Sequence, residues 1–113
     1  MDIQAYPPNV QRLVDSVLAS PAEAKPELRQ AVEAYAASVA GGKRVELPVP
    51  DDLRPYIDKV SRHAYKVTDK DVEQLKMAHY SEEQLFELTI SAALGSGLAR
   101  LEKTIDLLHG GRK

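Results

Sequence analysis

The sequence of 113 residues contains no cysteine, no tryptophan and a single phenylalanine. Without cysteine, the chain cannot form disulfides, thiolate metal sites or cysteine nucleophiles. Chains without disulfides are typical of reducing compartments, so we expect a cytoplasmic protein.

An excess of one charge and a long apolar run are also missing. Fifteen Lys and Arg residues oppose 17 Asp and Glu residues, which leaves a formal net charge of -2. Nucleic-acid binding usually needs a clustered cationic face, so we expect no nucleic-acid partner. The longest uncharged run, Leu88 to Ala99, is too short for a bilayer, which takes about 20 apolar residues. The N-terminus lacks the pattern of a signal peptide, so we expect no membrane association.

Hydrophobic residues make up 43% of the chain, which is close to the usual share in globular proteins. The length fits one compact domain over residues 1–113. We predict an all-α fold of about five helices. Residues 1–50 would form two N-terminal helices and an extended connector, and residues 51–109 would form the helical core.

The N-terminal half contains two helical patterns. Apolar residues at helical spacing predict a first helix near Asn9 to Ala19 and a second from Pro26 to about Ala40. Pro21 and Pro26 predict a turn over Ser20 to Lys25, between the two helices. Gly41-Gly42 ends the second helix. Lys43 to Pro50 alternates apolar residues, but its prolines interrupt any sheet ladder. We therefore expect an extended connector there.

A third helix is indicated by Asp51 or Asp52 as the N-terminal cap, with Pro55 in the first turn. Helical spacing gives it a broad apolar face, and His63 lies at the edge of that face. The residues predicted to form this face are Leu53, Tyr56, Ile57, Val60, Ala64 and Val67.

Two further helix starts follow. The run Thr68 to Asp71 predicts a short fourth helix whose inner face would include Val72, Leu75 and His79. Ser81 to Gln84 has the capping-box pattern, and a last helix from there would extend to about Leu108.

The last helix is unusual because apolar or small residues occupy nearly every face from Leu85 to Leu98. Such helices are central or are shared between subunits, so we expect a homo-oligomer to form through this segment. Gly95 and Gly97 each cost roughly 1 kcal/mol of helix stability relative to alanine. That cost is tolerable where another backbone approaches closely. We expect Glu87, within this segment, on the solvent side or paired with Lys or Arg.

One ordered combination of motifs extends over about half the chain, from Leu53 to Leu108. It resembles the small helical proteins of the alkylhydroperoxidase D-like and carboxymuconolactone decarboxylase superfamily, which implies an alkylhydroperoxidase D-like fold. The motifs that carry the resemblance are Val60-Ser61-Arg62-His63-Ala64-Tyr65-Lys66, Tyr80-Ser81-Glu82-Glu83 and Ala92-Ala93-Leu94-Gly95.

In the thiol peroxidase branch of that superfamily, a Cys-x-x-Cys pair is followed four residues later by a histidine. If His63 matches that histidine, the cysteine positions fall on Tyr56 and Lys59, neither of which can form a sulfenic acid. That branch also has a glutamate, which moves protons together with the histidine. Its position falls near Arg44 in this sequence, and we do not transfer its role to Glu46. The resemblance therefore implies a divergent member without thiol peroxidase activity, either a small-molecule-binding protein or a structural homo-oligomer.

Two alternatives remain open. The decarboxylase branch does not depend on the cysteine pair, and an enzyme of that type would use His63 for proton transfer beside Lys59, Arg62 and Lys66. The other alternative is a helical adaptor that binds another protein through an exposed groove.

The residues around His63 are the candidates for a small pocket. Tyr56, Lys59 and Tyr65 are expected to line it, although tyrosines at the edge of a core and a hydrogen-bonded helix histidine are the commoner interpretations. The three histidines, His63, His79 and His109, show no metal-ligand spacing, so we expect neither a metal nor another cofactor.

Overall fold

The computed structural model describes residues 6–45 and 47–109 of the chain. This part contains five α-helices, one short 3-10 helix and no strand, which confirms the prediction of an all-α fold. In chain order the elements are α1 (Pro8–Leu18), α2 (Pro26–Val39), α3 (Arg54–His63), η2 (Ala64–Lys66), α4 (Asp69–Met77) and α5 (Glu82–Leu108).

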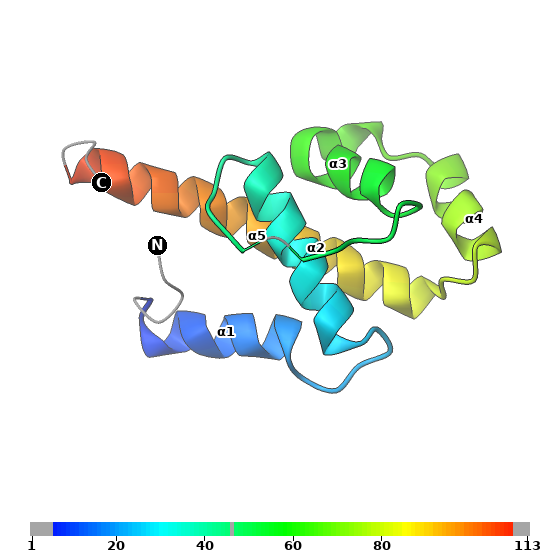
Figure 1. Cartoon of the computed structure of the whole chain (residues 1–113), viewed down its shortest axis with the longest axis horizontal. Helices are drawn as coiled ribbons and strands as arrows, with labels where there is room; N and C mark the ends of the chain where they lie inside the picture. The colour runs from blue at the N-terminus through cyan, green and yellow to red at the C-terminus, as the bar shows by residue number, and fades with distance from the viewer. Residues whose placement is uncertain (1–5, 46, 110–113) are drawn as a thin grey trace.

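Helix α5 is the central element of the fold, as predicted. It extends along the molecule, and α2 crosses it in the most extensive helix–helix contact, while α1 and α3 also pack on it (Figure 1). Gly95 makes the crossing possible. A Cβ atom at Gly95 would lie 2.2 Å from the carbonyl oxygen of Glu33 on α2, so only glycine allows this approach.

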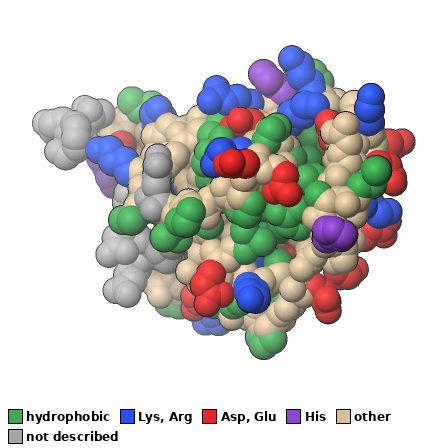
Figure 2. Space-filling view, turned by 45° about the vertical axis from the view of Figure 1, so that its right-hand side comes forward, with side chains coloured by type: hydrophobic (Ala, Val, Ile, Leu, Met, Phe, Trp, Pro, Cys, Tyr) green, Lys and Arg blue, Asp and Glu red, His purple; other side chains and the backbone are tan. Residues whose placement is uncertain are grey.

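The hydrophobic core has two parts. The main part lies between α2, α3 and the first half of α5, and Val32, Ile57 and Leu88 are fully buried there. The smaller part forms where α1 packs Val14 and Leu18 near the second half of α5. Figure 2 shows one face of the molecule, on which hydrophobic side chains gather in the middle and charged side chains surround them.

Both predicted helix starts are present, and each has a capping box. The Thr68 hydroxyl accepts from the backbone N–H of Asp71 at 3.2 Å, and the Asp71 carboxylate accepts from the backbone N–H of Thr68 at 2.9 Å. Ser81 and Gln84 make the same reciprocal contacts at 3.0 and 2.9 Å. These local contacts begin α4 and α5 at the predicted positions.

The turn between α1 and α2 is held by charged side chains. Arg29 of α2 is only 1% exposed, and its guanidinium donates to the carbonyls of Ala24 and Val17 at 3.0 and 2.8 Å, and also to that of Ser20. Since Val17 lies in the last turn of α1, the guanidinium satisfies carbonyls that a helix end leaves without partners.

Glu87 of α5 holds the same turn. Its carboxylate accepts from the backbone N–H groups of Glu23 and Ala24 at 3.1 and 2.6 Å. The expectation of a solvent-facing or cation-paired Glu87 was therefore wrong, because the half-buried carboxylate binds backbone amides brought to α5 by the fold.

The predicted cap of α3 was wrong. The helix begins after Leu53, and no side chain among the described residues caps it. Asp51 instead forms an ion pair with Arg54, and the Asp52 carboxylate accepts from the Tyr80 hydroxyl at 3.0 Å. Both carboxylates are therefore engaged by other side chains.

Two residues predicted on inner faces are exposed. Helix α3 ends at His63, and the backbone tightens into η2, which leaves Ala64 exposed, whereas Val67 packs against the core as predicted. Helix α4 ends at Met77, so His79 lies beyond it, exposed and with a left-handed φ of 78°.

Candidate functional site

The predicted pocket residues fall into two separate groups. Tyr56 and Lys59 of α3 line a cavity of about 220 Å³ between α3 and α4. The other residues that line this cavity are Asp52, Pro55, Asp71, Gln74, Leu75 and Ala78. His63 and Tyr65 do not line it.

Tyr56 has a structural contact at the inner end of the cavity. Its hydroxyl lies 2.7 Å from the Thr89 hydroxyl on α5, and the Thr89 hydroxyl donates to the Leu85 carbonyl at 2.6 Å. Because a hydroxyl has one hydrogen to donate, Tyr56 is the donor to Thr89. The Tyr56 hydroxyl is thereby committed to joining α3 to α5.

Lys59 forms an ion pair with Asp71 at the cavity wall. The ammonium lies 3.0 and 2.8 Å from the two carboxylate oxygens, and this contact joins α3 to the start of α4. The hydrogen bond from Lys59, together with the Thr68 backbone N–H, lowers the pKa of Asp71. The two charges at this cavity therefore neutralise each other.

His63 and Tyr65 lie on the surface at the end of α3. Their rings meet edge to face with centroids 5.7 Å apart, and the Tyr65 side chain is 81% exposed. The structure thus separates His63 from the cavity that Tyr56 and Lys59 line. The four site residues predicted from the sequence do not converge on one enclosed site.

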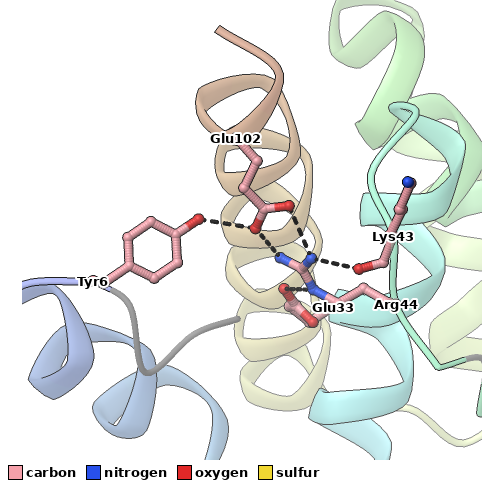
Figure 3. Close-up of polar contacts among 5 residues, drawn as sticks. All are labelled: Tyr6, Glu33, Lys43, Arg44 and Glu102. Carbon is pink, nitrogen blue, oxygen red and sulfur yellow. Dashed lines mark hydrogen bonds and ion pairs between the residues drawn. The ribbon is translucent and has the colours of Figure 1, made fainter. Parts of the chain in front are cut away.

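A second group of polar residues was missed by the sequence analysis. Tyr6, Glu33, Arg44 and Glu102 converge between the N-terminal segment, α2, the connector and α5, as Figure 3 shows. We call these four residues the Arg44 cluster. Tyr6, Glu33 and Glu102 are buried, and the Arg44 side chain is 11% exposed.

The contacts of the Arg44 cluster centre on the guanidinium. Arg44 Nη1 and Nη2 donate to the two oxygens of Glu102 at 3.2 and 3.0 Å, and Nε donates to Glu33 Oε2 at 3.3 Å. The Tyr6 hydroxyl donates to Glu102 Oε2 at 2.8 Å, and Arg44 Nη1 also donates to the Lys43 carbonyl at 2.8 Å. Two carboxylates therefore share one guanidinium.

The two carboxylates of the cluster have opposite electrostatic character. Burial raises the pKa of Glu33, and Arg44 only partly opposes this effect. Burial also acts on Glu102, but hydrogen bonds from Arg44 and Tyr6 outweigh it and lower the pKa of Glu102. Glu102 is thus the tightly held anion, and Glu33 is the group whose charge is less stabilised.

Sequence reasoning missed this cluster because its members come from four separate segments. Tyr6 and Glu102 are 96 residues apart, and Arg44 and Glu102 are 58 apart. One signal was available. Glu33 interrupts the apolar run Ala31-Val32-Glu33-Ala34, and a charge inside such a run is expected to have a partner.

The Arg44 cluster lies beside two surface cavities. Glu33 and Arg44 line one of about 310 Å³ between α1, α2 and the connector. Glu102 lines another of about 300 Å³ near Gly41, Gly42 and Lys103. Within residues 6–45 and 47–109, no three His, Cys, Asp or Glu side chains come together to hold a metal ion. None of the described helices is long and apolar enough to cross a membrane.

No family model, curated protein or solved structure matches this chain.

Proposed function

We propose that this protein is a cysteine-free homo-oligomer of the alkylhydroperoxidase D-like type, without thiol peroxidase activity, whose subunits associate through the outer face of α5. The carrying observation is an exposed apolar stripe along that helix. We call it the outer stripe, and it consists of Phe86, Ile90, Ala93, Gly97, Leu101 and Leu108.

The outer stripe lies opposite the face of α5 that packs on α2. Residues spaced by three or four positions share one side of a helix, whereas Gly95, which faces α2, lies on the other side. The Phe86 side chain is 63% exposed and Leu108 is 77% exposed. Large apolar side chains aligned on one exposed helix face are typical of an interaction surface.

Gly97 supports a close contact at the middle of the stripe. A Cβ atom at Gly97 would meet no atom of the described residues within 4 Å, so their packing does not require glycine there. Glycine nevertheless costs about 1 kcal/mol of helix stability relative to alanine. Close approach of another helix backbone accounts for this residue, and the small exposed Ala93 lies one turn before it.

The stripe favours a second copy of the chain as its partner. Along the sequence, Ile90 and Leu101 lie at nearly equal separations on either side of Gly95. An antiparallel pair of α5 helices that cross near Gly95 would therefore place each Ile90 opposite the Leu101 of the other copy. Such a self-complementary arrangement is what a two-fold interface requires.

The charges on α5 favour the same antiparallel arrangement. Its first half contains Glu82, Glu83 and Glu87 and no cation, whereas Arg100 and Lys103 lie in its second half with Glu102 and Asp106. Since Glu102 is engaged in the Arg44 cluster, the exposed charge of the second half is positive. Antiparallel pairing would bring opposite charges together at each end of the contact.

A small-molecule site between α3 and α4 has weaker support. Its volume of about 220 Å³ is below the usual range of ligand pockets, roughly 300–1,000 Å³. Its charged side chains, Lys59 and Asp71, already bind each other. An enzyme that uses His63 has no support from the cavity, because His63 lies outside it.

The proposal is tested by the molar mass of the protein in solution. We expect wild-type protein to have at least twice the chain mass of 12.5 kDa. Ile90→Glu with Leu101→Glu should give monomers, because each charge would be buried without a partner. Leu13→Glu, at an exposed apolar position on α1, is the matched control and should leave the mass unchanged.

Two results would contradict the proposal. One is a wild-type mass of 12.5 kDa at micromolar concentration, which would remove the role of the outer stripe. The other is peroxide turnover by the purified protein with a dithiol reductant, which would contradict the absence of thiol peroxidase activity.

A further inference from the structure

The cavity of about 310 Å³ beside the Arg44 cluster has an apolar wall and a charged inner end. Val14 and Leu18 of α1, Ala34 of α2 and Leu47 of the connector form the wall. Glu33 and Arg44 form the charged end. The volume is at the lower end of the range for ligand pockets, so it suits a small molecule.

Glu33 lines this cavity, and only one of its two carboxylate oxygens accepts a hydrogen bond from the described residues. The residue is 4% exposed, and its Oε2 atom accepts from Arg44 Nε at 3.3 Å. Among the described residues, no hydrogen bond or ion pair reaches its other oxygen, Oε1. This oxygen is not fully enclosed, so a ligand in the cavity that donates a hydrogen bond would find an acceptor there.

The charges around the cavity favour a cation as that donor. Glu33 shares Arg44 with Glu102, and the guanidinium directs its Nη1 and Nη2 atoms to Glu102 and to the Lys43 carbonyl. Asp15 adds a second carboxylate to the lining. An incoming carboxylate would meet both Glu33 and Asp15, and like charges at close range repel.

We propose that this cavity binds a small, mostly apolar primary amine, whose ammonium group donates to Glu33 Oε1 and whose hydrocarbon part lies against Val14, Leu18 and Ala34. The ammonium would supply a donor for Glu33 Oε1 and a positive charge for the second carboxylate of the cluster. The apolar wall would bury the hydrocarbon part and so select against fully polar cations.

A matched set of three ligands tests this proposal. Cyclohexylamine, cyclohexanol and cyclohexanecarboxylate share one ring and differ in the polar group. We expect the amine to bind wild-type protein at least about tenfold more tightly than either of the others near neutral pH. Titration followed by backbone amide chemical shifts would also locate the contact, with the largest changes in α1 and α2.

Variants distinguish a ligand role of Glu33 from a purely structural one. Glu33→Gln keeps the shape of the side chain and should weaken amine binding by about tenfold or more, without weakening cyclohexanol binding. Asp15→Asn is the control and should have a smaller effect, because Asp15 is exposed at the rim. Ala34→Leu leaves Glu33 in place but fills the cavity, so it should also weaken amine binding.

Several outcomes would overturn the proposal. These are equal affinity for the amine and the alcohol, preferred binding of the carboxylate, unchanged amine binding in folded Glu33→Gln protein, or no binding of the amine at millimolar concentration. If Glu33→Gln does not fold, as judged by circular dichroism, unchanged amine binding by folded Ala34→Leu protein would overturn it instead. The outer stripe of α5 does not line this cavity, so these results are independent of the oligomeric state.

Discussion

The side chain of Arg44 connects three segments of the chain through hydrogen bonds. It reaches from the connector to Glu33 on α2 and to Glu102 on α5, and Glu102 in turn accepts from Tyr6. Truncating a residue at the centre of such a buried network leaves the remaining charges without partners. Arg44 is thus a nearly buried cation that binds two glutamates.

The pH dependence of stability is predicted from Glu33. Because burial raises its pKa above the ordinary value of 4.5, the folded state binds more protons than the unfolded state just above that pH. The contribution of Glu33 is therefore most favourable below 4.5 and is lost as pH rises through the folded pKa.

Denaturation of wild-type and Glu33→Gln proteins across this pH range measures the effect. The free energy of unfolding of the wild-type protein, relative to the variant, should decline as pH rises through this window. The reason is that residue 33 loses a proton only in the wild-type protein. A difference between the two proteins that stays constant or changes in the opposite direction would show that Glu33 does not titrate with a raised pKa.

At the scale of elements, the end of α4 has an unusual residue. The backbone N–H of Tyr80 donates to the Leu75 carbonyl at 3.2 Å, and that of His79 donates to the Lys76 carbonyl at 3.1 Å. This pattern is the Schellman motif, in which the residue at the His79 position is usually glycine. Gly41 occupies the same position after α2, with a φ of 91°.

His79→Gly should therefore stabilise the protein. A left-handed conformation costs a residue with a side chain about 1–2 kcal/mol, and the greater freedom of glycine in the unfolded chain offsets part of this gain. We expect the free energy of unfolding to rise by roughly 0.5–1 kcal/mol in chemical denaturation. His79→Ala keeps the Cβ atom and should give no such gain, and an equal gain from alanine would contradict this explanation.

Elements were predictable where their signals were local. The helix-start signals at Thr68 and Ser81 and the glycine at Gly41 act within a few residues, and the structure has them where the sequence predicts them. The cap of α3 was not predictable, because Asp52 binds Tyr80, 28 residues away. The candidate sites were less predictable still, since His63 and Tyr56 share one helix but point to different surroundings.

At the scale of the whole molecule, the same helix has both an intramolecular and a free apolar face. Gly95 and Gly97 show the difference. A Cβ atom at Gly95 would collide with α2, whereas one at Gly97 would meet none of the residues that the structure describes. We infer that the first glycine serves the fold and the second serves association.

Substitutions at Gly97 should therefore change stability and association in opposite directions. Gly97→Ala should raise the unfolding free energy of the dilute protein by up to about 1 kcal/mol, because alanine favours the helix. Gly97→Leu should weaken self-association more than Gly97→Ala, because its larger side chain separates the helices. Sedimentation across a concentration series measures association, and tighter association of Gly97→Leu protein would contradict a close backbone approach.

The most direct test of association through the outer stripe is a distance between subunits. The natural chain has no cysteine, so a single Leu107→Cys substitution allows one spin label per subunit at an exposed position of α5. With α5 helices antiparallel about the Gly95 region, the rise of 1.5 Å per residue predicts a separation of about 35 Å along the helix axis. Parallel helices would give a separation closer to the interaxial distance of about 10 Å. A distribution centred near 35 Å is the expected result, and either a short distance or no intermolecular coupling would contradict the account.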